Sequence, residues 1–581
     1  MRFHSILNGH RYLHNQTQRL SKLSFSTRAV AAFESHRSPP ILDSNPDDLF
    51  HYTSGRWMHI IPYNESLRRS ERYLPFNVQE LRRLIAESIN KSKHEIVQFK
   101  KLAEGGFNRV FQASMLDGTQ LIARIPYPST TPKHLAVASE VATMDFLRCH
   151  DIPIPKVHAY SAVPENPVGA EYIIMDMAEG KPIGDYWYSM TKEERVKVIY
   201  QIAEIEGKLF SIHLPASGSI YYVKDLDSGT FRVDLPDPQG TSRFCIGPAT
   251  SQNLWCYERS FLDIARGPFI TAEDSFKAGA EKERAYLKKY GRDRHIRDRL
   301  LREVFGYRKQ SPGLYLQCLD DFLRIAEYIC PKKESFLARP TIRHPDLNPN
   351  NVFVSRSFDI LSLIDWQHCA ALPLFLQCGI PEYLQNYGDG VSESLVKPGL
   401  PKNMAVLDQR QQEAENEIFQ KRLSHYCYMA ATVEYNDSHF DALWEDPMMF
   451  RKRLFAHASS PWEGDNVTLK IDLIEATKNW SDIVTATAGD GVQPCPLSYP
   501  QTEVEECLRL GREIQEVDER FRVSTEYLGV GAEGWVPTER FEASKALEAE
   551  VKERALDFAE SDFERQMLET HWPFDDQDEQ E

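Results

Sequence analysis

His344-Pro-Asp346-Leu-Asn-Pro-Asn-Asn351 presents a histidine, a carboxylate two residues later and an amide five residues beyond that. A second carboxylate, Asp365, follows the short apolar segment Ile360-Leu-Ser-Leu-Ile364. Because asparagine, aspartate and proline favour turns, an Asx-rich turn between two strands is the alternative interpretation of the octet alone. The carboxylate just downstream favours a functional interpretation over that alternative.

Transfer of a phosphoryl group from ATP needs this set of side chains. One carboxylate orients the attacking hydroxyl and accepts its proton, while an amide oxygen and another carboxylate hold magnesium. The spacing matches the H-x-D-x-x-x-x-N loop and the later metal-binding aspartate of kinases. We therefore predict that Asp346 is the catalytic base and that Asn351 and Asp365 are ligands of Mg²⁺ on ATP.

Length and composition limit the other possibilities. A chain of 581 residues is too long for one small core, so two lobes with additional segments are expected. The balance of 68 Lys and Arg against 85 Asp and Glu gives a net charge of −17, which argues against a nucleic-acid partner. No apolar run is long enough to predict a transmembrane helix. The ten cysteines include no C-x-x-C pair, which argues against a structural zinc site or a disulfide framework.

The amino-terminal 33 residues differ from the rest of the chain. They contain arginines, a lysine and several serines but no acidic residue, and their apolar residues can form one face of a helix. This pattern is typical of a mitochondrial presequence, and a disordered basic tail is the alternative. Residues 34–75 are interpreted as an arm or linker leading into the folded body.

Residues 76–178 are predicted to form the first lobe. A helix can begin at Asn77, and the following strands are joined by a glycine turn within Glu104-Gly-Gly-Phe-Asn-Arg-Val-Phe111 and by an Asp117-Gly118 hairpin. Gly105 and Gly106 would let the backbone approach the phosphates of a nucleotide. Taken alone, a glycine pair between strands equally indicates an ordinary turn.

An arginine and a glutamate complete the predicted nucleotide site of this lobe. Arg124 ends the third strand, and Glu140 lies sixteen residues later in a predicted helix from His134 to Arg148. Kinases place a cation on this strand against the phosphates and orient it with a glutamate of the next helix. A purely structural ion pair is the alternative. Backbone groups at Asp176, Met177 and Ala178, where a strand ends, are predicted to contact adenine.

Residues 179–485 are predicted to form a second, mainly helical lobe. It contains a helix over 191–212 and an insertion over 215–300 that faces the substrate cleft. Residues 486–500 are a linker by composition. A helical extension over 501–570 follows, with helices at about 501–527 and 538–570, and residues 571–581 form an acidic tail.

Together these motifs resemble the aminoglycoside phosphotransferase/choline-kinase-like family over roughly residues 95–390. The resemblance implies a two-lobed α+β protein-kinase-like fold with an antiparallel-sheet N-lobe and a mostly helical C-lobe, followed by the helical extension. It also implies that His344 supports the catalytic loop without touching substrate. Several segments resemble more closely a fungal mitochondrial group called altered inheritance of mitochondria protein 9. They are Phe107-Asn-Arg-Val-Phe, Ala123-Arg-Ile-Pro-Tyr-Pro, Ser139-Glu-Val-Ala-Thr-Met and Ile364-Asp-Trp-Gln-His.

Two features depart from the larger family's pattern. The strand cation is Arg124 where many relatives have lysine, and the glycine turn is sparse. The function expected from this resemblance is an ATP- and Mg²⁺-dependent phosphotransferase that acts on a small hydroxyl-bearing molecule in mitochondria. One alternative is a catalytically silent kinase-like protein that binds a nucleotide or partner in mitochondrial maintenance. Another keeps the metal site and transfers a nucleotidyl group.

Overall fold

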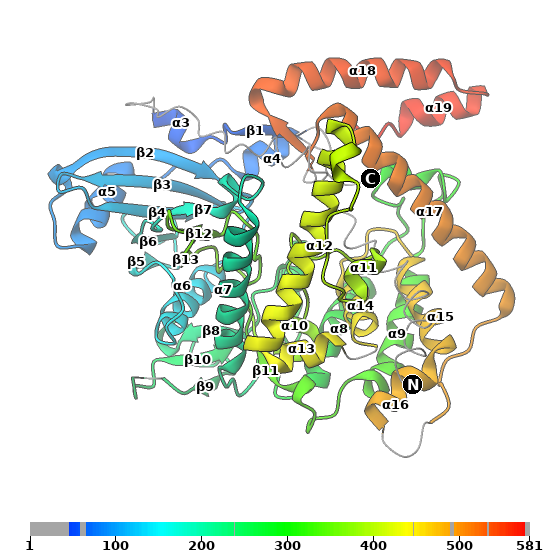
Figure 1. Ribbon diagram of the computed structural model, residues 1–581, viewed down its shortest axis with the longest axis horizontal. Coiled ribbons are helices and arrows are strands. Elements are labelled where there is room, and N and C mark those ends of the chain that lie inside the picture. Colours follow the sequence, from blue (N-terminus) through cyan, green and yellow to red (C-terminus); the bar gives the residue numbers. More distant parts are fainter. Residues whose placement is uncertain are drawn as a thin grey trace.

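The computed structural model describes residues 46–57, 65–237, 239–444, 447–488, 493–531 and 534–575. The predicted presequence, residues 1–33, lies outside these ranges, as do parts of the predicted arm, linker and acidic tail. Within them the chain forms two lobes, with a sheet-containing N-lobe to the left of a larger helical C-lobe (Figure 1). This arrangement confirms the predicted two-lobed α+β fold.

The N-lobe is built on a five-stranded antiparallel sheet with the order β2-β3-β4-β6-β5. Alternate residues of its strands are buried on opposite faces, so one face packs on helix α5 and the other faces the C-lobe. Asn77 caps α5 by accepting the backbone N–H of Glu80 at 3.1 Å. The elements are β2 (Ile96–Glu104), β3 (Asn108–Met115), β4 (Gln120–Pro126), β5 (Val157–Ser161), β6 (Tyr172–Asp176) and α5 (Val78–Ser88).

Helix α6, Leu135–Arg148, lies between the N-lobe sheet and the C-lobe. Almost all of its side chains are buried, because it is covered by the sheet on one side and by the strands of the second lobe on the other. The sequence predicts the helix to begin at His134, but this residue has a φ of 60° and precedes the first helical turn. Burial on every side explains why α6 can hold a charged residue such as Glu140 away from water.

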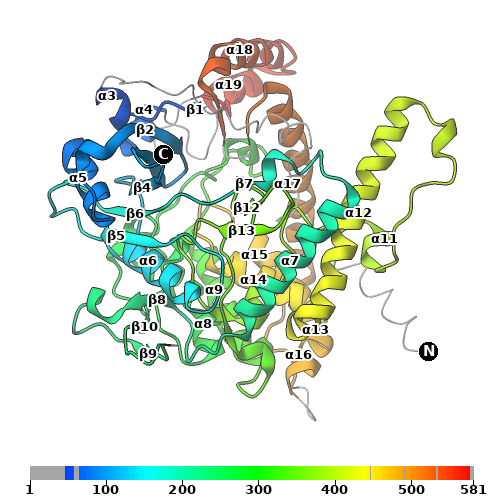
Figure 2. The ribbon, with the colours of Figure 1, turned by 60° about the vertical axis from the view of Figure 1, so that its left-hand side comes forward.

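The C-lobe contains the hairpin that connects the loop His344–Asn351 to Asp365. Strands β12 (Val352–Val354) and β13 (Ile360–Leu363) pair with each other, and β12 also pairs with β7 (Lys181–Pro182). Helices α7 (Lys192–Ser211) and α12 (Gln409–Tyr435) pack beside each other next to this hairpin. Figure 2 shows the amino-terminal half of α12 projecting from the body of the molecule.

The predicted insertion over residues 215–300 has its own small sheet. Strands β8 (Ser219–Tyr222), β9 (Val233–Leu235) and β10 (Phe244–Gly247) have the order β8-β10-β9, and β8 packs against α6. The remaining elements of the C-lobe are α8 (Ala272–Tyr290), α9 (Pro312–Ile329), β11 (Pro340–Thr341), β14 (Leu372–Pro373), α10 (Leu374–Gln377), α11 (Gly390–Glu393), α13 (Asp437–Trp444), α14 (Met448–Ser459), α15 (Thr468–Lys478) and α16 (Trp480–Ala488).

The carboxyl-terminal helices run along the C-lobe and return to the N-lobe side (Figure 1). Helix α17 (Gln501–Leu528) is followed by strand β15 (Trp535–Pro537), which pairs with β1 (Gly55–Trp57) of the amino-terminal arm. The arm also contains the short helices α3 (Pro46–Phe50) and α4 (Glu65–Glu71). The two ends of the described chain are therefore joined by a small antiparallel sheet.

The last helical segment corrects a prediction. The sequence predicts one helix over 538–570, whereas the structure has α18 (Phe541–Asp557) and α19 (Asp562–Thr570). Ser561 begins the second helix by accepting the backbone N–H of Glu564 at 3.1 Å, and a new amino-terminal cap marks a new helix.

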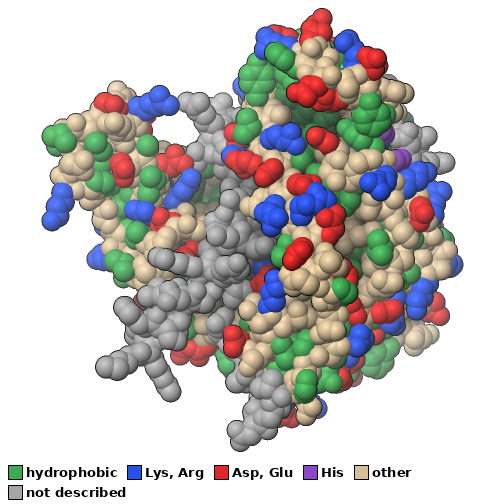
Figure 3. Space-filling model, turned by 90° about the vertical axis from the view of Figure 1, so that its right-hand side faces the viewer, with side chains coloured by type: hydrophobic (Ala, Val, Ile, Leu, Met, Phe, Trp, Pro, Cys, Tyr) green, Lys and Arg blue, Asp and Glu red, His purple; other side chains and the backbone are tan. Residues whose placement is uncertain are grey.

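Among the described residues, no helix combines the length and the apolar character that crossing a bilayer would require. On the face shown in Figure 3, lysine and arginine side chains are interspersed with aspartate and glutamate side chains outside the grey area.

Candidate active site

The loop His344–Asn351 connects β11 to β12 and is held by its own side chains. Asn351 Nδ2 donates to the backbone carbonyl of Asp346 at 2.9 Å and to its Oδ2 at 3.2 Å. Asn348 Nδ2 donates to the same carboxylate oxygen at 2.7 Å. Asp346 is exposed, so its carboxylate is oriented by two amides but remains accessible from solvent.

His344 links this loop to the strand that leads to Asp365. Its Nδ1 accepts the backbone N–H of Asp346 at 3.1 Å, so Nε2 carries the proton and donates to the carbonyl of Ile364 at 2.8 Å. Burial lowers the pKa of His344, and its ring lies edge-on to Trp366 with the ring centroids 4.5 Å apart. The imidazole is thus a neutral connector between the two predicted parts of the site.

Arg124 connects the two lobes at the centre of the site. Its guanidinium forms an ion pair with Glu140 of α6, and Nη2 donates to Asp365 Oδ1 at 2.6 Å and to Gln367 Oε1 at 2.8 Å. Asp365, two residues after the end of β13, has a φ of 68°, which is uncommon for a residue other than glycine, and its side chain is partly exposed. The structure therefore brings together three of the predicted site residues, which come from three different elements.

The charges around Arg124 do not balance. Two carboxylates, Glu140 and Asp365, face one guanidinium. Burial raises the pKa of Glu140 to about 7 against the pull of Arg124. Burial also acts to raise the pKa of Asp365, but the attraction of Arg124 outweighs it and lowers that pKa. The site retains a surplus carboxylate that a bound cation could neutralise.

The glycine turn of the N-lobe lies over this cluster. Gly105 N donates to the carbonyl of Asn108 at 2.9 Å, which closes the turn between β2 and β3. A Cβ atom added to Gly106 would meet no atom within 4 Å. No contact within the described chain therefore requires glycine here, in agreement with a turn whose open side is available to a ligand.

Glu104 anchors the base of the glycine turn to the amino-terminal arm. Its Oε2 accepts hydrogen bonds from the backbone N–H groups of Thr53 at 2.8 Å and Ser54 at 2.9 Å. Its Oε1 accepts hydrogen bonds from Lys101 Nζ at 2.9 Å and Arg109 Nε at 3.2 Å. Burial acts to raise the pKa of Glu104, but these cations and N–H groups lower it. No pattern in the sequence indicates this anchor, because the arm and the strand are about fifty residues apart.

The predicted adenine-contact segment is partly occupied by bonds within the protein. The N–H of Asp176 donates to Lys156 O at 2.9 Å, and that of Met177 donates to Gln120 O at 3.3 Å. The carboxylate of Asp176 accepts from His158 Nε2 at 2.6 Å. A groove of about 810 Å³ runs along residues 176–179, including Ala178, but no residue of the Arg124 cluster lines it. The N–H groups of Asp176 and Met177 are therefore engaged before any adenine arrives.

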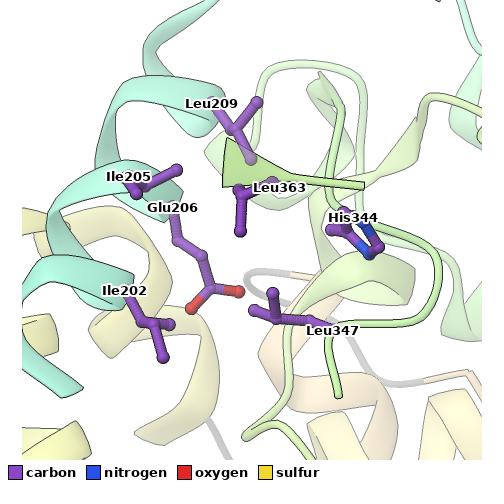
Figure 4. A pocket seen from close by; sticks show the side chains of 7 residues that line it. All are labelled: Ile202, Ile205, Glu206, Leu209, His344, Leu347 and Leu363. Carbon is purple, nitrogen blue, oxygen red and sulfur yellow. The ribbon is translucent and has the colours of Figure 1, made fainter. Parts of the chain in front are cut away.

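A second buried ion pair, between Arg343 and Glu206, lies next to the loop His344–Asn351. Arg343 Nε donates to Glu206 Oε1 at 2.6 Å, and Tyr428 donates its hydroxyl to Glu206 Oε2 at 2.5 Å. Figure 4 shows Glu206 extending from α7 toward Leu347 and His344 in a small apolar pocket. Sequence reasoning gave no role to this pair or to Gln367, although Arg343 directly precedes His344 and Gln367 lies two residues after Asp365.

Comparison with known proteins identifies the family. The model for the phosphotransferase enzyme family matches residues 98–374. The subtelomeric hrmA-associated cluster protein of Aspergillus fumigatus is 32% identical over 514 residues, which cover 82% of this chain and 96% of the relative. The chain belongs to the phosphotransferase enzyme family. This agrees with the resemblance seen in the sequence.

Other relatives are more distant. The mitochondrial protein altered inheritance of mitochondria protein 9 of Saccharomyces cerevisiae is 23% identical over 577 residues, which cover 86% of this phosphotransferase-family chain and 88% of the relative. Among solved structures, the streptomycin–ATP–APH(2″)-IIa ternary complex is 14% identical, with a TM-score of 0.32 and coverage of 70% of this chain and 98% of that one.

Proposed function

We propose that this protein transfers the γ-phosphoryl group of ATP, with Mg²⁺, to a hydroxyl group of a small molecule. The proposal is supported by the family membership and by the arrangement of the loop at Asp346 with Asp365 and Arg124. Transfer of this kind depends on positioning and on electrostatic stabilisation more than on covalent chemistry by the protein. The side chains of the site would therefore act by holding or orienting the acceptor hydroxyl, the metal ion and the phosphates.

Asp346 is the proposed base. Its carboxylate is exposed and accepts hydrogen bonds from Asn348 and Asn351, so it is oriented without being neutralised by a cation. A hydroxyl of an acceptor at this carboxylate would be aligned for attack and would release its proton to Asp346.

Asn351 and Asp365 fit the donor set that Mg²⁺ prefers. The Nδ2 group of Asn351 donates to Asp346, which leaves the amide oxygen as the atom available to a cation. Magnesium is usually bound by one or two protein oxygens together with phosphates and water. When bound, the ion would neutralise charge on the phosphates, and Asp365 and Asn351 are the residues that would hold it.

Arg124 is the proposed contact for the phosphates of the nucleotide. Its guanidinium is held by Glu140 on one side and reaches toward Asp365 on the other, which orients it toward the metal-binding carboxylate. A planar group with several donors can bind a phosphate and keep a carboxylate partner.

One observation carries the proposal. A hydrogen-bonded network through His344 joins Asp346 to Ile364, the residue directly before Asp365, because the two ring nitrogens of His344 bond to the backbones of Asp346 and Ile364. A turn that only connected two strands would have no need of this network.

Protein lacking residues 1–33 tests the proposal with MgATP and an extract of mitochondrial metabolites. Magnesium-dependent thermal stabilisation by ATP is expected whether the protein is an enzyme or a silent nucleotide-binding protein. Only an enzyme consumes ATP with the extract, and Asp346→Asn should reduce this turnover by about 10²–10⁴-fold while MgATP still binds. The matched control is Asp359→Asn. Asp359 lies on the connection between β12 and β13, and its exposed carboxylate pairs with Lys197, so this substitution should leave turnover unchanged. Unchanged turnover in Asp346→Asn would exclude the assigned base.

The proposed location is the mitochondrion. The support is the basic, acid-free composition of residues 1–33 and the printed name of the yeast relative. Fluorescence microscopy of the full chain and of the chain lacking residues 1–33, each fused to a fluorescent protein at the carboxyl terminus, tests it. Mitochondrial signal that is lost with residues 1–33 is expected, and signal that does not depend on them would contradict a presequence.

A further inference from the structure

Asn108 and Gln367 make a direct contact between the lobes next to Arg124. Asn108 begins β3 directly after the glycine turn, and Gln367 follows Asp365 by two residues. Both side chains are buried, and Asn108 Nδ2 lies 2.6 Å from Gln367 Oε1. The bond joins residues 259 positions apart, so it closes the N-lobe against the C-lobe at the glycine turn.

A second contact crosses the lobes beside the first. Phe107, within the glycine turn, lies edge-on to the ring of His368 with the ring centroids 5.5 Å apart. The carbonyl of Phe107 accepts hydrogen bonds from Tyr127 N at 2.9 Å and Thr130 Oγ1 at 2.7 Å, and His368 Nδ1 bonds to Thr250 O at 2.9 Å. Both sides of the crossing are thereby held in place by their own lobes.

The polar atoms at this crossing cannot all be matched as donors and acceptors. The same Asn108 amide group that contacts Gln367 also lies 2.6 Å from Arg124 Nη2, and Arg124 Nη2 lies 2.8 Å from Gln367 Oε1. Arginine only donates, so both amides would have to present oxygen to it. Two oxygens would then face each other, and turning over either amide places two N–H groups in contact instead.

A three-membered ring of groups that each only donate or only accept always contains one mismatched pair. Such a pair in a buried site costs free energy, because neither group can turn to water. The mismatch disappears if Arg124 moves to another acceptor, since Asn108 Nδ2 can then donate to Gln367 Oε1 without competition.

We propose that Asn108 and Gln367 form an interlobe latch that positions the glycine turn and favours the transfer of Arg124 from Gln367 to a phosphate oxygen. The inference rests on the proposed use of ATP. In the ligand-free protein the latch includes Arg124 and carries the mismatch. In the nucleotide complex the Asn108–Gln367 bond remains and holds the turn over the phosphates. Asn108 and Gln367 are positioning residues, because they act through Arg124 and the turn.

The latch has a defined consequence for nucleotide affinity. Removing either amide relieves the mismatch in the free protein and also removes the bond that persists in the complex. Both changes weaken binding, so Asn108→Ala and Gln367→Met should each raise the Kd of the magnesium complex of a non-hydrolysable ATP analogue by about tenfold. Because one bond is lost in either case, the double variant should also show about a tenfold increase.

Calorimetric titration of these variants with the magnesium complex of the ATP analogue tests the predicted changes in Kd. Gln201→Met is the matched control, because Gln201 makes partly buried amide hydrogen bonds to the Phe358–Ile360 segment and none to Arg124. Its Kd should equal that of the wild type. A Kd within twofold of the wild-type value in both single variants would overturn the proposal, and so would single effects that multiply in the double variant. If Asn108→Ala does not fold, Gln367→Met, which conserves side-chain volume, decides the question.

Hydrogen exchange of the ligand-free protein tests the latch independently of nucleotide. The backbone amides of residues 105–108 should exchange faster in Gln367→Met than in the wild type or in Gln201→Met, because the turn loses its bond to the C-lobe. Unchanged exchange would overturn the latch. A wild-type protein that does not bind the analogue at all would instead contradict the proposed function, while the exchange measurement would still decide whether the latch exists.

Discussion

Two buried arginine–glutamate pairs belong to the candidate active site and its surroundings, and they differ in the balance of their charges and hydrogen bonds. Arg343 donates to Glu206 and to the carbonyls of Gln377 at 3.1 Å and Gly379 at 2.7 Å, all within the C-lobe. Arg124 faces Glu140 and a second carboxylate across the lobe boundary. One pair has matched charges and the other has a surplus negative charge.

The difference separates a framework from a binding site. A buried pair with balanced charge and complete hydrogen bonds gains nothing from a ligand, and removing one partner leaves an uncompensated charge. A pair with an extra carboxylate and a mismatched amide can gain from both a cation and a phosphate. We therefore expect changes near Arg343 to affect stability and changes near Arg124 to affect nucleotide binding.

The largest expected effect is on stability. Glu206→Gln should lower the free energy of unfolding by about 3–5 kcal/mol, because Arg343 loses its only carboxylate partner among its described contacts. Glu140→Gln should lower it by only about 1–2 kcal/mol, since Arg124 keeps Asp365. Urea denaturation of both variants measures the difference. Equal losses would mean that the two pairs are equivalent frameworks.

The hydroxyl of Tyr428 provides a smaller test of the framework pair. Tyr428→Phe removes its donation to Glu206 and should lower the free energy of unfolding by about 1.5–3 kcal/mol, the range for hydrogen bonds to charged groups. The Kd of the magnesium–ATP analogue, measured by calorimetry, should not change. A large change in that Kd would show that the framework reaches the nucleotide site.

Replacing each arginine with lysine shows which of the two pairs contributes to nucleotide binding. Arg124→Lys should raise the Kd of the magnesium complex of the ATP analogue about tenfold. One ammonium group cannot keep the contacts to Glu140, Asp365 and Gln367. Arg343→Lys should lower the melting temperature and leave the Kd of the folded protein unchanged. Titration calorimetry well below the melting temperature gives both values, and equal effects on Kd would remove the distinction.

The smallest expected effect concerns pH. Arg124 holds the pKa of Asp365 below its ordinary value, so the stabilisation from this pair is present above that ordinary value and is lost only in more acidic solution. In Arg124→Met, burial acts unopposed and raises this pKa. The stabilisation of this variant by Mg²⁺ and the ATP analogue should therefore begin to fall at a higher pH than that of the wild type. Parallel thermal-shift curves for the two proteins would contradict the role of Arg124.

What the sequence could predict follows from the range of the interactions. The octet at His344 is local, since Asn351 bonds to Asp346 within one loop, and its spacing alone indicated the turn and its chemistry. The pairing of Arg124 with Glu140 depends only on the connection from a strand to the next helix. The two-lobed fold followed from these patterns and from the family resemblance.

The contacts that were missed join distant parts of the chain. The bond between Asn108 and Gln367 and the anchoring of Glu104 by the amino-terminal arm leave no periodic or spacing signal in the sequence. The break between α18 and α19 was missed for another reason. Both segments have helical composition, and only the cap geometry of Ser561 separates them.

The most direct measurement uses ATP labelled with ¹⁸O in the γ-phosphoryl group, with mass spectrometry of the products formed from mitochondrial metabolites. The wild type should form ADP and move the labelled phosphoryl group to one small molecule, and Asp346→Asn should do neither although it binds MgATP. Label found in pyrophosphate would indicate nucleotidyl transfer instead. Equal transfer by the wild type and Asp346→Asn would contradict the assignment of Asp346 as the catalytic base.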